Sequence, residues 1–232
     1  MSPDKSDFVA APDHIVADGQ AVSTLTLTLR DGNGNAVSGQ AATLSAKVAG
    51  AGDTQVTGFT EGMAGSYTAG LTGTEAGQAT VQAMQGARPA SNDKPAVTLT
   101  ADAGTAQVKS VLLQGDEVSR VADGSSSFRY AVTVTDANGN PVADQTVTAQ
   151  ADKPDHVTVA VDGATNAAGQ TTVTLTSTTT AVSDIQVSVR AGSTGTMVDA
   201  DKKVSFVAGA VSPDKSDFVA APDHIVADGQ AV

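Results

Sequence analysis

The sequence predicts an all-β chain of two tandem β-sandwich domains followed by the truncated first strand of a third domain. Three observations predict this organisation: a long segment that occurs twice, a shorter motif that recurs at half that spacing, and apolar residues that alternate with polar ones. The 232 residues suffice for two domains near the commonest size of about 100 to 150 residues.

Residues 2–22 read SPDKSDFVAAPDHIVADGQAV, and residues 212–232 repeat these letters without change. A fold tolerates many sequences, so an identical run of this length indicates a copied segment. We expect the chain to be an excerpt from an array whose unit is about 210 residues long. On this interpretation Met1 is an added start residue.

A half-period divides this unit. The string VADG begins at Val16, Val121 and Val226, at a spacing of 105 residues. DGNGNAVSGQ at 31–40 and DANGNPVADQ at 136–145 have the same spacing. Each unit therefore contains two homologous but divergent domains.

These repeats predict domains at residues 2–107 and 108–211, with 212–232 as the start of the next repeat. The last segment supplies a strand without the rest of its domain. We expect its first few residues to pack on the second domain and the remainder, with Phe218 and Ile225, to be poorly ordered. The alternative is exchange of this strand into the first domain of another molecule, which gives head-to-tail chains.

The period-two pattern predicts strands in both domains. Leu25, Leu27 and Leu29 alternate with polar residues, as in a half-buried strand. The same strand in the second domain carries Tyr130, Val132 and Val134. Further strands are expected at residues 43–48, 66–71, 79–84, 97–101, 108–113, 146–149, 157–161, 171–176, 185–189 and 204–207. Short strands separated by turn residues are typical of a β-sandwich.

Aromatic residues make up only 3% of the chain, and Trp is absent. The core must therefore consist of Val, Leu, Ala and Ile around a few rings. Single aromatic residues on strands more often pack in a core than form a ligand platform. The expected core anchors are Phe8, Phe59, Tyr67, Phe128, Tyr130 and Phe206.

The loops DGNGN at 31–35 and DANGN at 136–140 place oxygen-bearing side chains at alternate positions, as a calcium loop does. The rest of the calcium pattern is missing, because its glycine is replaced by Ala36 or Pro141 and its last ligand by Ala42 or Val147. Tight hairpin turns explain both loops better, with positive φ at Asn33-Gly34 and Asn138-Gly139. Asp18-Gly19 and Asp123-Gly124 are expected to be turns in which Asp bonds to the nearby backbone.

Carboxylates near the domain boundaries raise a second metal hypothesis. Such groups from neighbouring domains could share a hard cation that stiffens the linker. Solvated surface carboxylates are the more economical interpretation, because the chain has 25 acidic residues. The residues concerned are Asp102, Asp116 and Glu117 at the first boundary, and Asp199, Asp201, Asp214 and Asp217 at the second.

Composition excludes several functions. The formal net charge of −12 disfavours nucleic acid and anionic lipid as partners. Cysteine is absent, which excludes disulfides and a cysteine nucleophile. His14 and His224 occupy one repeat position and His156 has no counterpart, so no histidine pair recurs. Without a GxSxG, P-loop or HExxH motif, the sequence predicts no enzyme, no catalytic, cofactor-binding or metal site, and no cofactor.

Several segments together resemble the group 1 bacterial immunoglobulin-like domain, which occurs in tandem in intimin, invasin and related outer-membrane adhesins. The similarity covers both domains and rests on the ADG opening, the D-x-N-G-N-P-V hairpin and the final KKVSFVA strand. The first domain departs from the pattern at Ala36, where proline is preferred, and in KPAVTLTA at 94–101. Neither difference threatens the fold.

The resemblance implies the stalk of a Gram-negative outer-membrane adhesin on the cell surface. Membrane anchor and receptor-binding tip then lie outside this chain, and the partners within it are neighbouring repeats. We expect an elongated monomeric spacer in which each domain adds about 30 to 40 Å. The alternative is that the repeats themselves bind a host glycan or receptor, or self-associate between cells through strand edges or Thr-rich faces.

Overall fold

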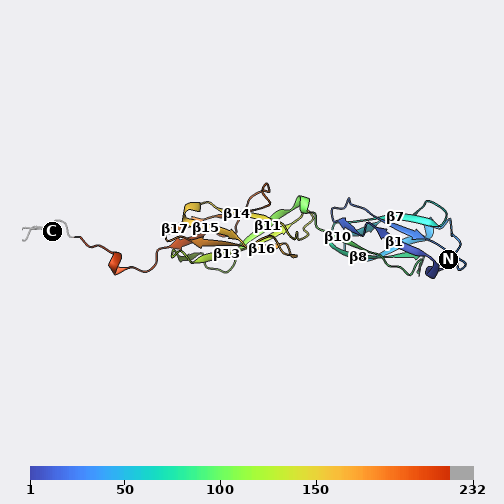
Figure 1. Ribbon diagram of the computed structural model, residues 1–232, viewed down its shortest axis with the longest axis horizontal. Coiled ribbons are helices and arrows are strands. Elements are labelled where there is room, and N and C mark those ends of the chain that lie inside the picture. Colours follow the sequence, from blue (N-terminus) through green and yellow to red (C-terminus); the bar gives the residue numbers. More distant parts are fainter. Residues whose placement is uncertain (220–232) are drawn as a thin grey trace, which may run out of the picture.

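The computed structural model describes residues 1–219 and contains two β-sandwiches arranged end to end (Figure 1). The predicted all-β architecture of two tandem sandwiches is confirmed. Short 3-10 turns are the only helical elements in residues 1–219, and no helix there is long and apolar enough to cross a membrane. These turns are η1 (Pro3–Lys5), η2 (Ala41–Thr43), η3 (Ala103–Thr105), η4 (Pro154–His156) and η5 (Pro213–Lys215).

The first sandwich contains two sheets, with strand orders β1-β3-β7-β5 and β2-β10-β8-β4; β6 pairs with β7 and β9 with β8. The N-terminal segment contributes to both sheets, since β1 is antiparallel to β3 and β2 is parallel to β10. The strands are β1 (Asp7–Ala11), β2 (His14–Val16), β3 (Ser23–Thr28), β4 (Leu44–Gly50), β5 (Thr54–Val56), β6 (Thr60–Glu61), β7 (Ser66–Gly73), β8 (Gly77–Gln85), β9 (Arg88–Pro89) and β10 (Ala96–Thr100).

The second sandwich repeats this plan. Its strand orders are β11-β13-β16-β15, β12-β20-β17 and β14-β18-β19. Strand β12 is parallel to β20, as β2 is to β10. The strands are β11 (Gln107–Leu113), β12 (Ser119–Val121), β13 (Ser127–Thr135), β14 (Val147–Ala151), β15 (Val157–Val161), β16 (Gln170–Ser177), β17 (Val182–Ile185), β18 (Val187–Ala191), β19 (Val198–Asp199) and β20 (Val204–Val207).

Each sandwich has its own hydrophobic core. One cluster of buried side chains spans Phe8 to Leu99, and the other spans Val108 to Phe206. All six predicted aromatic anchors are at most 6% exposed, which confirms their role in packing. The residue boundaries proposed for the domains, 2–107 and 108–211, stay a prediction.

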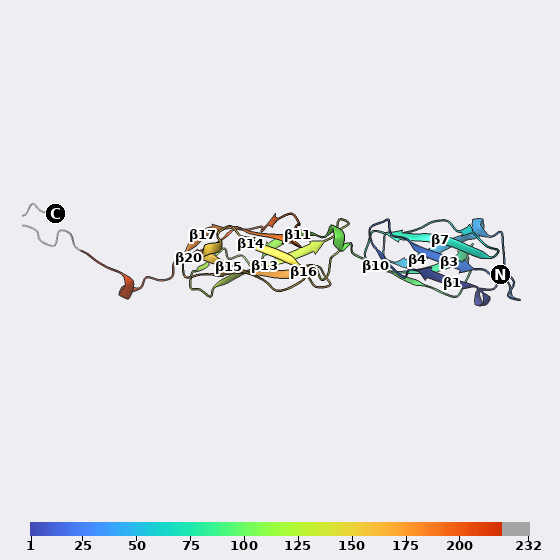
Figure 2. The same cartoon turned by 45° about the horizontal axis from the view of Figure 1, so that its top comes forward.

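The long axes of the two sandwiches follow one line, and the strands run roughly along it (Figure 2). Each sandwich therefore exposes its connecting loops at its two ends. The N-terminus lies at the outer end of the first sandwich, and the chain leaves the second at the opposite end (Figure 1). Such an arrangement makes the loops the elements through which neighbouring sandwiches meet.

The turn predicted at Asn33-Gly34 and Asn138-Gly139 is only partly correct. Gly34 and Gly139 have positive φ values of 89° and 90°, but the two asparagines do not. The reason is an aspartate at the start of each loop, whose carboxylate binds backbone N–H groups and holds the chain in a wider turn. The Asp18 and Asp123 turns are as predicted: each Oδ1 accepts two backbone N–H groups.

The prediction that the C-terminal segment packs on the second sandwich is wrong for the residues described. Residues 207–219 are all exposed, and Phe218 is 94% exposed. Phe8, the same position in the first repeat, is 2% exposed because β1 pairs with β3 and places it in a core. No such strand pairs with the described part of the segment. Ile225 lies outside the described residues, and strand exchange stays a prediction.

Candidate functional site: the junction between the sandwiches

The loop of residues 136–140 meets the end of the first sandwich. Asp136 organises the loop internally: its Oδ1 accepts hydrogen bonds from the backbone N of Asn138 at 2.9 Å and of Asn140 at 2.8 Å. The backbone N of Gly139 donates to the carbonyl oxygen of Asp136 at 3.1 Å. Gly139 has a positive φ of 90°, a backbone conformation that residues with a side chain rarely adopt. The loop therefore presents its two asparagines in a fixed geometry.

Three hydrogen bonds from these asparagines cross the junction. Asn138 Nδ2 donates to the carbonyl oxygen of Ala17 at 2.9 Å. Asn140 Nδ2 donates to the carbonyl oxygen of Thr74 at 2.8 Å, and Asn140 Oδ1 accepts from the backbone N of Ala76 at 2.8 Å. We call Asn138, Asn140 and these three backbone partners the asparagine clasp. It joins a loop of one sandwich to two separate turns of the other.

The linker between the sandwiches closes onto the same loop. The backbone N of Asp102 donates to Asp136 Oδ2 at 3.0 Å. Asp102 Oδ1 in turn accepts from the backbone N of Gly104 at 2.9 Å and caps η3. The backbone N of Ala137 donates to Thr105 Oγ1 at 3.3 Å. The linker is therefore hydrogen-bonded to the loop at both ends of this turn, at Asp102 and at Thr105.

Burial and charge favour a fixed junction. Asp136 is 1% exposed and Asn140 is 7% exposed. Burial alone would raise the pKa of Asp136, but the hydrogen bonds from Asn140, Asp102 and Asn138 hold this pKa below its ordinary value. Asn140 Nδ2 uses both hydrogens, on Thr74 and on Asp136 Oδ2 at 2.9 Å. The buried polar groups of the clasp are satisfied, so each holds its neighbours in position.

The structure does not bring the predicted boundary carboxylates together. Asp102 lies at the junction, but Asp116 pairs with Lys202 at 3.5 Å and Glu117 with Arg120 at 3.4 Å. Asp199 accepts from Ser188 Oγ at 2.6 Å and Asp201 from the backbone N of Leu113 at 2.8 Å, while Asp214 and Asp217 are exposed. Within residues 1–219, no three acidic, histidine or cysteine side chains gather as a metal site would require.

The histidines are also separate in the described part of the chain. His14 Nδ1 bonds only to its neighbour Asp13, at 2.9 Å. His156 ends η4, and His224 lies outside the described residues.

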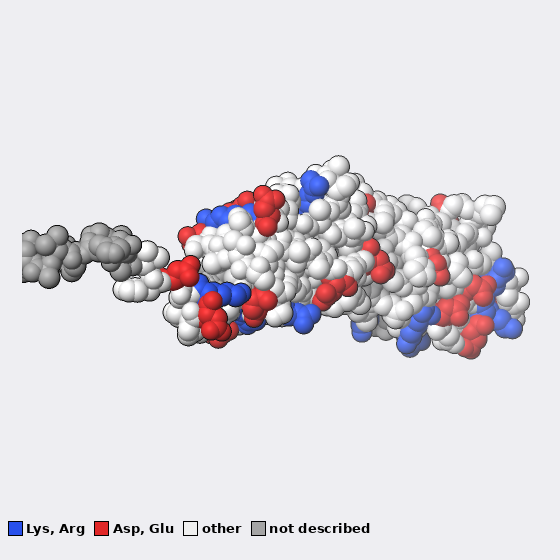
Figure 3. Space-filling model, turned by 60° about the vertical axis from the view of Figure 1, so that its left-hand side comes forward, with Lys and Arg blue, Asp and Glu red and all other residues white. Residues whose placement is uncertain are grey.

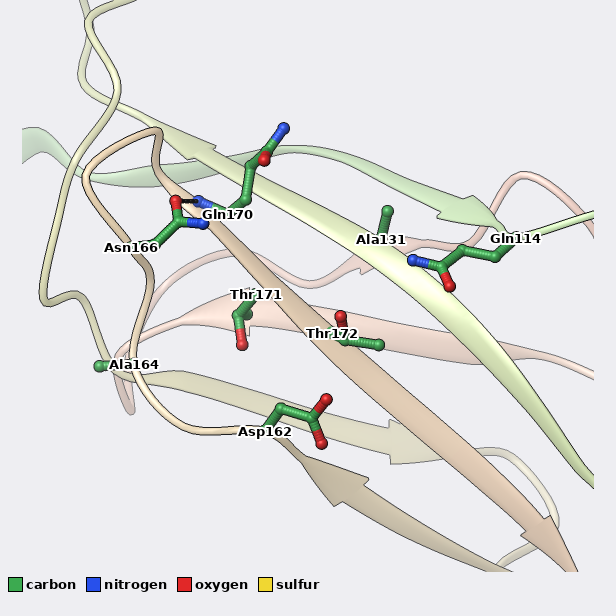
Figure 4. A pocket seen from close by; sticks show the side chains of 8 residues that line it. All are labelled: Gln114, Ala131, Asp162, Ala164, Asn166, Gln170, Thr171 and Thr172. Atoms are coloured by element: carbon green, nitrogen blue, oxygen red, sulfur yellow. Dashed lines mark hydrogen bonds between the residues drawn. The ribbon is translucent and has the colours of Figure 1, made fainter.

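A hollow on one face of the second sandwich offers little chemistry (Figure 4). Its lining is mostly Thr, Gln, Asn and Ala, from β13, β16 and the adjoining loops. The one charged lining side chain, Asp162, pairs with Arg129 at 3.1 Å. Asn166 Oδ1 accepts from the backbone N of Gln170 and serves its own turn. On the face in Figure 3, acidic and basic side chains are dispersed over both sandwiches.

Both sandwiches match known families of bacterial domains. Residues 2–102 match the family model "Invasin, domain 3", and residues 110–207 match "Bacterial Ig-like domain (group 1)". The resemblance to group 1 domains thus fits the second sandwich, whereas the first matches a related invasin domain. The inverse autotransporter adhesin YeeJ of Escherichia coli K12 is 29% identical over 137 residues, which is 59% of this chain and 6% of YeeJ.

Solved structures agree with this result. Invasin, a bacterial integrin-binding protein, is 25% identical with a TM-score of 0.57, over 89% of this chain and 40% of the other. The Escherichia coli adhesin FdeC is 25% identical with a TM-score of 0.52, over 90% and 65%. Yersinia pseudotuberculosis InvD shares the fold, with a TM-score of 0.58 at 23% identity over 94% and 62%.

The chain is thus a tandem pair of immunoglobulin-like β-sandwiches. It belongs to the intimin/invasin family of bacterial adhesins. It spans only a small fraction of the length of the adhesin YeeJ, 6%.

Proposed function

We propose that this chain is part of the repetitive stalk of an outer-membrane adhesin and acts as an elongated spacer. The observation that carries the proposal is the asparagine clasp, which joins the two sandwiches end to end through three partly buried hydrogen bonds. With a junction of this kind, the length of the stalk increases with the number of sandwiches. A unit of two sandwiches extends the stalk by about 60 to 80 Å, given a rise of about 3.3 Å per strand residue.

The surface supports a spacer rather than a binding or catalytic module. The hollow shown in Figure 4 is lined mostly by uncharged polar groups, and its single carboxylate is already paired. In the family, adhesion to a receptor by a distal tip is consistent with repeats that contribute distance. We therefore place this segment on the surface of a Gram-negative cell, as a monomer between a membrane anchor and a receptor-binding tip.

A labelling experiment distinguishes a spacer from a segment that itself binds a target. The purified chain, fluorescently labelled, is applied to host cells, glycan arrays and cells that display the same adhesin. A spacer leaves all three unlabelled and stays monomeric over a concentration series. Saturable labelling of any target would contradict the proposal and favour binding by the repeats, and a concentration-dependent dimer would favour self-association.

A second arm tests length directly. In the intact adhesin, residues 2–211 are replaced by unrelated sandwich domains of equal length, or are deleted. A spacer tolerates the replacement but not the deletion in an adhesion assay. Loss of adhesion with the equal-length replacement would assign a specific surface role to these repeats.

A further inference from the structure

The loop of residues 31–35, at the outer end of the first sandwich, has the same internal structure as the clasp loop. Asp31 Oδ1 accepts from the backbone N of Asn33 at 2.9 Å and of Asn35 at 2.8 Å, and Gly34 N donates to the Asp31 carbonyl at 3.1 Å. Asn35 Nδ2 donates to Asp31 Oδ2 at 3.0 Å. The corresponding distances around Asp136 differ by at most 0.1 Å.

This loop has the conformation of the clasp loop, but within residues 1–219 no second sandwich contacts it. Asn35 is exposed, whereas its counterpart Asn140 is 7% exposed; Asn33 and its counterpart Asn138 are both exposed. Within residues 1–219, the Asn33 side chain and Asn35 Oδ1 have no hydrogen-bond partner. The loop lies beside the N-terminus, since the backbone N of Ser2 donates to the Arg30 carbonyl at 2.7 Å.

The far end of the second sandwich reproduces the surface that the clasp binds. Ala122 N donates to the Val207 carbonyl at 2.8 Å, as Ala17 N does to that of Thr100. The Asp123 turn after Ala122 repeats the Asp18 turn after Ala17.

A second contact supports this equivalence. A Cβ placed on Gly124 would lie 3.6 Å from Thr179 Cγ2, and one placed on Gly19 would lie 3.1 Å from Thr74 Cγ2. Thr179 thus takes the place of Thr74, and Ala181 that of Ala76. Both are exposed.

We infer that the 31–35 loop docks on the far end of a second sandwich from the preceding copy of this sequence, through a second asparagine clasp. The expected bonds join Asn33 Nδ2 to the carbonyl oxygen of Ala122, and Asn35 to the carbonyl oxygen of Thr179 and the backbone N of Ala181. This inference rests on the proposed function, because it requires that the unit repeat along one chain.

The length of the linker between copies affects the strength of the proposed contact. Between β10 and β11 six residues, 101–106, separate the sandwiches; after β20, nine residues, 208–216, precede the position that corresponds to the start of β1. A short tether of this kind holds two surfaces at an effective concentration of the order of mM. The tether therefore favours these hydrogen bonds within one chain over the same bonds between separate molecules. A docked array and a monomeric excerpt are therefore compatible.

The test uses a chain in which residues 1–211 are followed by a second copy of residues 2–232. Cysteine is absent from the sequence, so single cysteines at Asp155 of the first copy and Ala87 of the second accept spin labels cleanly. Pulsed electron resonance then measures the distance distribution across the new junction. We expect one narrow peak, and loss of that peak when the second copy carries N33A and N35A.

Two control variants distinguish docking of the loop from unfolding of the loop. N33A alone removes no bond within its own loop, so a change with this variant reports docking and not loop unfolding. The first copy carrying N33A and N35A serves as the matched control and keeps the narrow peak. A broad distribution in the unsubstituted chain, or a narrow peak that survives both substitutions in the second copy, overturns the inference. Either result leaves the spacer proposal to be judged by its own binding and replacement experiments.

Discussion

The side-chain amide of Asn140 lies between the carbonyl oxygen of Thr74 and the backbone N of Ala76, with 2.8 Å to each. One residue of the second sandwich thereby satisfies a donor and an acceptor in a turn of the first. Asp136 supports it by accepting the remaining amide hydrogen. The relative position of the sandwiches depends on a short polar loop and its two asparagines.

The clasp predicts a direct effect of the double substitution N138A and N140A. The Thr74 carbonyl and the Ala76 N–H lose their side-chain partners at a partly buried site, which costs at most about 1 to 3 kcal/mol for each group left unsatisfied. We expect the distance distribution between spin labels at Lys47 and Lys109 to broaden. The double variant N33A and N35A removes the same side chains from the free loop and should leave this distribution unchanged. Equal distributions in all three chains would show that the clasp does not fix the junction.

The buried carboxylate makes the junction sensitive to acid. The folded-state pKa of Asp136 lies below its unfolded value of 3.8, so the stabilisation by the charged form is fully present above that value. It is lost as the pH falls through the folded pKa. We expect the Lys47 to Lys109 distribution to stay narrow over the pH range above the unfolded value of 3.8, and to broaden as the pH falls through the folded pKa. D136N should broaden it throughout that range; a pH-independent width in the unsubstituted chain would contradict this role.

Two buried tyrosines should respond differently to removal of the hydroxyl. Tyr67 donates to the Val37 carbonyl at 2.7 Å and accepts from the backbone N of Gln40 at 3.2 Å. The buried Tyr130 hydroxyl has no partner within the described residues, and burial raises the pKa of Tyr130. We expect Y67F to lower the free energy of unfolding by about 1 kcal/mol. Y130F should be neutral or stabilising in the same denaturant titration, and a large loss there would reveal a partner for its hydroxyl.

Calcium should not stabilise the chain. Asp116, Glu117 and Asp201 near the boundaries bind separate partners, and the described residues hold no cluster of three acidic, histidine or cysteine side chains. We expect the same melting temperature in calcium chloride and in chelator. A rise with calcium that D102N removes would restore the hypothesis of a shared cation at the first boundary.

Much of the fold could be predicted, because strands and cores follow from side-chain alternation. Leu25, Leu27 and Leu29 are fully buried, as the period-two pattern requires. The turn type at Asn138 was wrong, since the pattern Asn-Gly does not reveal that Asp136 takes two backbone N–H groups. The clasp cannot be predicted from the sequence because its partners in the first sandwich are two backbone carbonyls and one backbone N–H group, which have no sequence signature. The recurrence of Asn33 and Asn35 at the positions of Asn138 and Asn140 was the available signal.

Small-angle X-ray scattering of the 232-residue chain over a concentration series tests the central claim most directly. Two sandwiches held end to end predict a rod-like pair-distance distribution and the mass of a monomer at every concentration. A compact particle with the sandwiches side by side, or a mass that grows with concentration, would contradict the account of this segment as a rigid spacer.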